Sequence, residues 1–360
     1  MHTETGTGLP EKPLTELDPL LEAFEKRRQT FVRRILFANL LFFLFFFPIF
    51  VSLLLHPGER HSNLILTAVV AAVIWGLLNF IVSGHGRSEY LRDFKLQVIR
   101  PIVEAFGDRI RYSPFTHVSR HHLQRSRLFP RSVTHVSGGD HIKGFFKEVY
   151  FECSYIEAEE RERLEGWLTM PAAPRGHDVK PAKRTVPVFR GFFMVAEFSK
   201  HFRGRTFIYD ESDYNPSAIV QEMFEEKQRR RIRMDHPLFE RTFNVYGSDE
   251  IETHYLLTHS MMERILRLRR LSGTAPMALA FSGGHFYLAV SRAGELFDVS
   301  LFRPTGAGQT KAYVSTVRDS LAIIEELRLN LRIWSKAEGE RSGIERFLQR
   351  SGGMPGAFLF

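Results

Sequence analysis

The sequence predicts an α+β protein: two N-terminal transmembrane helices, followed by a cytoplasmic domain of mostly antiparallel strands with segregated helices. Two long apolar stretches without charge predict the transmembrane part. In the remainder, apolar residues that alternate with period two predict strands, and apolar residues at three- and four-residue steps predict helices. Strands and helices in separate groups are typical of α+β folds.

The two apolar stretches are residues 35–55 and 64–82, and neither contains a charged side chain. A bilayer core of ~30 Å needs about 20 helical residues, and neither stretch has the polar face of a soluble core helix. We therefore predict transmembrane helices at 35–55 and 64–82, joined by a short external loop at 56–63. Pro48 is expected to kink the first helix, which lipid-embedded helices tolerate.

Basic residues flank both predicted helices, and such residues tend to remain in the cytoplasm. Both termini are therefore expected in the cytoplasm of a multi-pass inner-membrane protein. A cleaved signal peptide is not expected, because residues 1–34 are polar and the apolar run is too long. The flanking cations are Lys26, Arg27, Arg28, Arg33 and Arg34 before the first helix, and Arg87, Arg92, Lys95 and Arg100 after the second.

Small residues recur at four-residue steps in the second predicted helix, at Ala68, Ala72 and Gly76. Such a stripe allows a neighbouring helix to approach closely. Its partner is either the first helix of the same chain or a second subunit, which would make a homo-oligomer.

The formal net charge is +8 and the isoelectric point is about 9.6. The single cysteine, Cys153, excludes an intramolecular disulfide and a multi-cysteine zinc site. Outside the membrane part we expect a cytoplasmic N-terminal segment at 1–34, a juxtamembrane amphipathic helix at 83–112, an α+β domain at 113–335 and a C-terminal tail at 336–360.

The first half of the soluble part begins with a helix at 87–106 that bends at Pro101 and stops at Gly107. An irregular stretch then extends to about residue 137. "SGGDHIKG" predicts a turn and a short strand before a half-buried strand in "KEVYFECSYIEAE". Further along, the sequence predicts a basic loop at 171–185, strands at 186–198 and 205–211, and a charged helix at 217–231.

The second half opens with "RTFNVYGSDEIETHYLLT", which predicts strands around a turn at Gly247. Ser260 and Glu263 have capping-box spacing for a helix that stops near Gly273. "PMALAFSGGHFYLAV" predicts a hairpin that turns at Gly283–Gly284. A helix at 313–334 is expected to pack on the strands around Leu279 and Tyr287, with Glu326 on its far face. Its apolar seam is Val317, Leu321, Ile324, Leu327, Leu331 and Trp334.

Five motifs occur in a fixed order after the apolar stretches: "GDHIKG", "VFRGFFMVAEFSKHFRGRT", "FERTFNVYGSDEIETHYLLTHSMMERI", "FSGGHFYLAV" and "LRLNLRIW". With them the chain resembles the bacterial family called domain of unknown function 3137, over about residues 24–334. The resemblance implies a two-span inner-membrane protein with a cytoplasmic domain, and it implies no activity. His254 departs from the family pattern, in which arginine is common at this position.

Histidines concentrate between His117 and His141, and this stretch is a candidate for metal or anion binding, or a solvated basic linker. The other members are His121, His122 and His135, and Asp140 directly precedes His141. Cys153 is a candidate nucleophile, but on the apolar side of a strand a cysteine more often acts as a small hydrophobe. Asp249, Glu250 and Glu252 form an acidic cluster near His254, where carboxylates could exchange protons; polar residues that alternate along an exposed strand face are the commoner interpretation.

The run "KQRRRIR" is the strongest local concentration of charge. The run is either a solvated helix face or a lipid contact. Because a membrane-anchored chain meets anionic lipid first, the lipid partners would be head groups at Arg229, Arg230, Arg231 and Arg233. Nucleic acid is less favoured, since the run has no aromatic residue for base stacking.

These observations favour a membrane-anchored cytoplasmic binding or scaffolding module with an unknown protein partner. The alternative is a membrane-bound enzyme with its site near His254 and Glu252 or in the stretch from His117 to His141. The sequence contains no phosphate loop, nucleophile elbow or dinucleotide-binding motif. We therefore predict no catalytic residue, no cofactor and no metal ligand.

Overall fold

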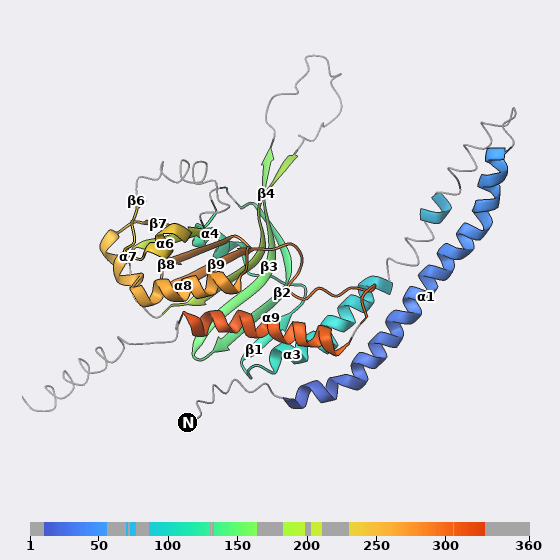
Figure 1. Ribbon diagram of the computed structural model, residues 1–360, viewed down its shortest axis with the longest axis horizontal. Coiled ribbons are helices and arrows are strands. Elements are labelled where there is room, and N and C mark those ends of the chain that lie inside the picture. The colour runs from blue at the N-terminus through green and yellow to red at the C-terminus, as the bar shows by residue number, and fades with distance from the viewer. Residues whose placement is uncertain are drawn as a thin grey trace, which may run out of the picture. The chain divides into compact units, whose positions relative to one another are not determined.

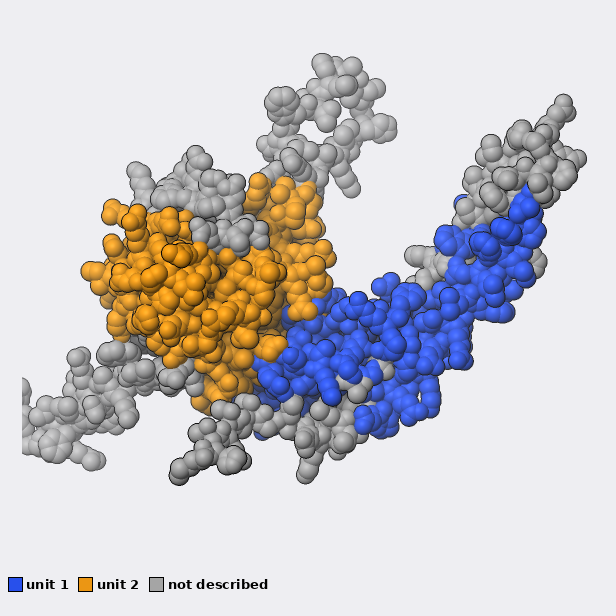
Figure 2. Space-filling model, in the orientation of Figure 1, with its two compact units in different colours: residues 1–115, 295–318 blue, residues 116–294, 319–360 orange. Residues whose placement is uncertain are grey.

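The computed structural model describes residues 11–55, 70, 73–76, 86–129, 131, 133–163, 183–198, 203–210, 230–304 and 306–327. The chain divides into two compact units (Figure 2). Unit 1 comprises residues 1–115 and 295–318, and unit 2 comprises residues 116–294 and 319–360. Helix α9 (Ala307–Glu326) begins in the first unit and ends in the second.

Unit 1 is built on one long helix, α1 (Glu11–Leu55), which includes the predicted span 35–55 (Figure 1). Between Asp18 and Pro48, α1 is long and apolar enough to cross a membrane, and none of its most apolar window is buried. The second predicted span, 64–82, lies mostly outside the described residues. Its described segment 73–76 is helical, and Trp75 Nε1 donates a hydrogen bond to Asn39 Oδ1 of α1 (2.9 Å).

The helix predicted at 87–106 is interrupted by a π-helical turn. Residues 86–94 are α-helical, Lys95–Ile99 form the π-helix η1, and α3 covers Arg100–Glu104. The backbone N–H of Arg100 reaches back five residues to Lys95 O, so the wider turn comes just before Pro101, which lies in the first turn of α3. Pro101 lacks an N–H, and this position tolerates the loss.

Packing between α1 and the 86–94 helix is aromatic. The ring of Phe24 meets Tyr90 and Phe94 edge-on, at centroid distances of 5.7 and 5.4 Å. All three side chains are buried. Such edge-to-face pairs fix the relative rotation of two helices, and they determine which residues of α1 lie toward the second helix.

Unit 2 is an antiparallel sheet with the strand order β2-β3-β4-β9-β8-β5-β7-β6. This confirms the predicted α+β class. The strands are β2 (His135–Phe146), β3 (Val149–Arg163), β4 (Lys183–Glu197), β5 (Arg205–Asp210), β6 (Arg230–Arg231), β7 (Phe243–Gly247), β8 (Met277–Ser282) and β9 (His285–Ser291). The helices are α4 (Arg120–Ser126), α6 (Pro237–Thr242), α7 (Glu250–Leu256) and α8 (His259–Leu271).

The register assigns side chains to two faces, because residues opposite each other on neighbouring strands share a face. We call one the α4 face, since Leu123 of α4 is buried in the same core cluster as Val195 and Tyr287. The other is the α8 face, where Arg269 of α8 pairs with Asp210. Cross-strand rows define them: Glu152, Val195, Tyr287, Ala280, Phe207 and Tyr246 on the α4 face; Cys153, Met194, Leu288, Leu279, Ile208 and Val245 on the α8 face.

The hairpin prediction is confirmed: β8 and β9 are joined at Gly283 and Gly284, whose φ angles are +57° and +73°. A two-residue turn of this hand favours glycine at both positions. The hairpin also shows that Leu279 and Tyr287 lie on opposite faces, so the last helix cannot pack on both.

Several local predictions are wrong. "SGGDHIKG" contains no turn, although it does belong to the predicted partner strand of β3. That strand, β2, bulges between Gly139 and Ile142, and the turn to β3 lies at Lys147–Glu148. Ile110–Ser113 form strand β1, and α4 also lies within the stretch predicted to be irregular. The charged helix does not extend through Arg231, because Arg230–Arg231 pair with β7; residues 217–229 lie outside the described residues.

The segment after Gly247 is helical rather than extended. Asp249 accepts a hydrogen bond from the N–H of Glu252 (2.8 Å) and caps α7, which explains why polar residues that alternate here do not form a strand. Thr258, rather than Ser260, caps α8, and accepts from Met261 N–H (3.3 Å). Gly273 follows this helix with φ +65°, as expected.

Candidate functional site

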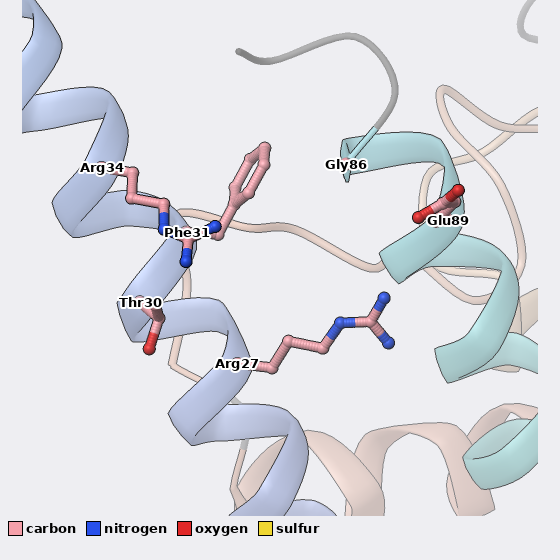
Figure 3. A pocket seen from close by; sticks show the side chains of 6 residues that line it. All are labelled: Arg27, Thr30, Phe31, Arg34, Gly86 and Glu89. Atoms are coloured by element: carbon pink, nitrogen blue, oxygen red, sulfur yellow. The ribbon is translucent and has the colours of Figure 1, made fainter.

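A hollow of about 760 Å³ lies in unit 1 between α1 and the 86–94 helix (Figure 3). Its lining residues on α1 recur at three- and four-residue steps, which puts them on one helical face. We call it the basic hollow. It is lined by Arg27, Thr30, Phe31, Arg34, Gly86 and Glu89.

Glycine at position 86 allows the two helices to approach at the hollow. A Cβ atom added to Gly86 would lie 2.5 Å from Cε2 of Phe31. Such a contact is far inside van der Waals distance, so any larger residue would move the Phe31 ring and change the wall of the hollow.

The two guanidinium groups of the hollow differ in their partners. Arg27 pairs with Asp93 across the two helices (2.7 Å), and its side chain reaches from α1 toward the second helix (Figure 3). Arg34 is exposed and has no hydrogen-bond or ion-pair partner within the described part of the chain. The Thr30 hydroxyl donates to Lys26 O (2.9 Å). Arg34 is therefore the cation in the hollow that is available to an anion.

His141, the last residue of the predicted histidine stretch, lies in a polar cluster at one end of the α4 face. His141 Nδ1 lies 3.2 Å from the hydroxyl of Thr116, and Nε2 lies 3.2 Å from Glu152 Oε2. Tyr150 donates to the other carboxylate oxygen of Glu152 (2.6 Å). Both His141 and Glu152 are largely buried side chains. Thr116 is exposed.

Electrostatics fix the protons of this cluster. The hydrogen bond from His141 lowers the pKa of Glu152 to about 2; burial opposes this, and Tyr150 adds to it. Burial and the bond to Glu152 raise the pKa of Tyr150 to about 12. An ionised Glu152 only accepts, so His141 donates from Nε2. In the neutral imidazole, Nδ1 then accepts the proton of Thr116. Every polar group is satisfied, and the cluster ties residue 116 to the sheet.

The remaining histidines do not converge on this cluster as metal ligands. His117 contacts its neighbouring carbonyl, Val118 O (2.9 Å). His122 lies on α4 near His285, with ring centroids 6.4 Å apart, and burial lowers its pKa. His135 begins β2. The stretch is thus spread over a loop, a helix and a strand.

Cys153 lies on the α8 face, opposite the histidine cluster. Its side chain is buried, and burial raises the pKa of its thiol above the ordinary value. A nucleophilic cysteine needs an accessible thiolate. The structure therefore supports a packing role for Cys153.

Two carboxylates of the acidic cluster near His254 accept hydrogen bonds from backbone N–H groups. Asp249 caps α7. The carboxylate of Glu252 accepts hydrogen bonds from the backbone N–H groups of Arg203 (3.2 Å) and Gly204. His254 is exposed in the last turn of α7.

The arginines predicted to bind lipid are only partly described. Arg230 and Arg231 form β6, and Arg231 pairs with Glu240 at 3.6 Å. Arg233 is exposed, and Arg229 lies outside the described residues. Of the small-residue stripe, Ala68 and Ala72 also lie outside them. Nothing described lies within 4 Å of a Cβ added at Gly76.

In the sequence, Arg27 and Arg34 indicate membrane topology, and their positions do not predict the basic hollow. Their spacing, which puts both on one face of a helix, can be recognised in the sequence. The pairing of α1 with the 86–94 helix cannot be recognised there, because it depends on contacts between residues more than 60 positions apart, such as Arg27 and Asp93.

The model of the family described as "Protein of unknown function (DUF3137)" matches residues 187–329. Over these residues the chain is similar to that family. This confirms the resemblance seen in the motifs, over the C-terminal part of the range they cover. No curated protein matches the sequence.

A solved structure is also similar: the crystal structure of the mycobacterial trehalose monomycolate transport factor A, TtfA. The sequences are 8% identical, and the alignment covers 64% of this chain and 94% of that one, with a TM-score of 0.33. A TM-score this low supports no inference about fold or function.

Proposed function

We propose that this protein is anchored in the bacterial inner membrane by two helices, with both termini and its α+β domain in the cytoplasm, and that it binds anionic lipid head groups in the basic hollow. The apolar side chains that α1 exposes support the anchor. The exposed fractions are 63% for Leu36, 62% for Phe37, 64% for Leu40 and 63% for Phe43. Side chains of this kind are costly in water and stable in lipid.

The observation that carries the proposal is the position of Arg34 without a partner. It immediately precedes the apolar residues 35–55, and Arg27 lies two helical turns earlier. In a protein of the proposed topology, this is the depth of the lipid phosphate groups on the cytoplasmic side. A guanidinium group binds phosphate oxygens through two parallel hydrogen bonds.

Charge and shape both favour a lipid head group as the occupant. Asp93 neutralises Arg27, and Glu89 is the other carboxylate beside the hollow, so the attraction for an anion comes from the guanidinium of Arg34, which is unpaired within the described part of the chain. Each arginine near an anionic leaflet contributes about 1 kcal/mol of attraction. The Phe31 ring provides an apolar wall beside the cations, which suits a molecule with a charged head and an apolar body.

The test is native mass spectrometry of the full chain, released from nanodiscs that contain phosphatidylglycerol and phosphatidylcholine. We expect the unmodified protein to retain phosphatidylglycerol. Replacing Arg34 with glutamine should reduce the retained fraction at least threefold. Arg33→Gln is the matched control, because it removes one exposed charge at the same depth but Arg33 does not line the hollow.

Two results would contradict the proposal. If Arg33→Gln lowers retention as much as Arg34→Gln, the membrane-proximal charge acts only as a diffuse field. If neither change matters, the hollow does not hold lipid.

A weaker lipid contact through Arg229, Arg230, Arg231 and Arg233 remains part of the proposal, as does a protein partner for the α+β domain. Replacing these four arginines with glutamine should lower salt-sensitive adsorption to anionic vesicles. Reporter fusions at residues 20, 58 and 360 test the topology, and external activity at 20 or 360 would exclude it.

A further inference from the structure

Three side chains of the types that bind transition metals meet in unit 2, away from the basic hollow. They are His236, His259 and Glu263, and each offers a ligand atom within 4.8 Å of the others. The two imidazole rings are stacked, with centroids 4.8 Å apart and planes inclined by 27°. Glu263 Oε1 lies 3.6 Å from His259 Nε2.

The fold brings these groups together from two elements. His259 begins α8, and Glu263 is one turn further on the same face, since positions i and i+4 are neighbours on a helix. His236 precedes α6 as its N-cap residue, and α6 packs against α8. Two ligands on one helix and a third from another element can coordinate one face of a metal ion.

The exposure of the cluster suits a metal that keeps water ligands. The side chains of His259 and Glu263 are 73% and 51% exposed, so they can adjust by the ångström or so that coordination requires. The cation nearest to Glu263 is Arg267, at 4.0 Å, but that guanidinium is bound to Glu326 at 2.7 Å. The carboxylate of Glu263 is therefore only weakly paired with Arg267 and is available to a metal ion.

From this geometry we propose that His236, His259 and Glu263 bind a divalent transition metal of the zinc class. Two imidazole nitrogens and one carboxylate oxygen form a known ligand set for Zn²⁺, with water in the fourth position. Magnesium prefers an octahedral shell of oxygen ligands, so it binds this set poorly.

Metal binding has a structural consequence at α6. His236 Nδ1 accepts a hydrogen bond from the N–H of Phe239 (3.3 Å). An imidazole that coordinates through its other nitrogen carries its proton on Nδ1 and can no longer accept. Binding therefore exchanges one long cap hydrogen bond for a coordinate bond, and the amide of Phe239 should become less protected from hydrogen exchange.

The test is a titration of the full chain, without a histidine tag, with ZnCl₂ against a chromophoric zinc chelator. We expect one zinc equivalent to be taken from the chelator, and an excess of Mg²⁺ should not displace it. His259→Gln, Glu263→Gln and His236→Asn should each weaken this equivalent at least tenfold. Asparagine is a strong N-cap residue, so the last change removes the imidazole while keeping the cap.

His254→Gln is the matched control, because it removes an exposed histidine of α7 that is not part of the cluster. This variant should bind zinc like the unmodified chain. Binding should also fall in acid, because protons compete with the metal for imidazole nitrogen. If the three cluster variants bind zinc as the control does, or if no variant changes the stoichiometry, the site does not exist.

Discussion

Two neighbouring rows of the unit 2 sheet lie one residue apart along the strands, and only one of them contains charged side chains. The row that begins at Cys153 on the α8 face is apolar from end to end, and its members are at most 1% exposed. The row through Glu152 on the α4 face has two charged members, Lys143 and Glu152, and continues through Val195, Tyr287 and Phe207.

The comparison shows how a sheet admits an ionised group at the margin of its core. Glu152 lies opposite the exposed Lys143 of β2, and His141 and Tyr150 satisfy both carboxylate oxygens. Buried charges are tolerated when they are paired and hydrogen-bonded. A stabilising polar network of this kind differs from the basic hollow, where Arg34 is left for a ligand.

The largest expected effect comes from a cavity in the apolar row. Leu279→Ala removes a fully buried side chain and should cost about 2–5 kcal/mol of the free energy of unfolding. For a domain of this size, the thermal midpoint of the full chain should fall by roughly 5 °C or more. Differential scanning fluorimetry in detergent measures it.

Leu271→Ala is the matched control, since this leucine at the end of α8 is 69% exposed. It should shift the midpoint by less than about 1 °C, as surface substitutions usually do. Equal shifts for both leucines would mean that the apolar row is not the main core of unit 2.

An intermediate effect is expected from Glu152→Gln. At neutral pH we expect a loss of about 1–2 kcal/mol, because charge-assisted hydrogen bonds to His141 and Tyr150 are weakened. The pKa of Glu152 is lowered from 4.5 to about 2 in the folded protein. Its stabilising contribution is therefore complete above about pH 4.5 and is lost as the pH falls toward 2.

Midpoints measured from pH 6 to pH 2.5 check this linkage. The unmodified chain should approach the Glu152→Gln variant as the pH falls through this window. A constant difference between the two proteins would show that the carboxylate contributes through shape rather than charge.

The smallest effect should come from Thr116→Val at the outer edge of the same cluster. Thr116 is exposed, and its hydrogen bond to His141 is 3.2 Å long. We expect a loss below about 0.5 kcal/mol, because water can replace this partner. Thermal midpoints decide the matter: a loss as large as that of Glu152→Gln would make Thr116 an integral member of the network.

The sequence by itself determined the elements whose pattern is local. The hairpin at Gly283–Gly284 was predicted because its turn requires glycine, and the apolar stretch 35–55 is helical in α1 as its composition requires. The buried Val317, Leu321 and Ile324 follow the helical period predicted for the last helix. In each of these cases the residues within one helix or one hairpin carry a pattern that indicates the conformation, although packing stabilises it.

Only the tertiary structure decided the rest. Glu326 was expected to face away from the domain, but it pairs with Arg267 of α8, a partner that helical period cannot identify. Asp249 caps a helix where polar residues that alternate suggested a strand. Glu152 and His141, Arg27 and Asp93, and His236 and Glu263 meet through strand register or helix packing, which depend on contacts between distant residues and leave no local pattern in the sequence.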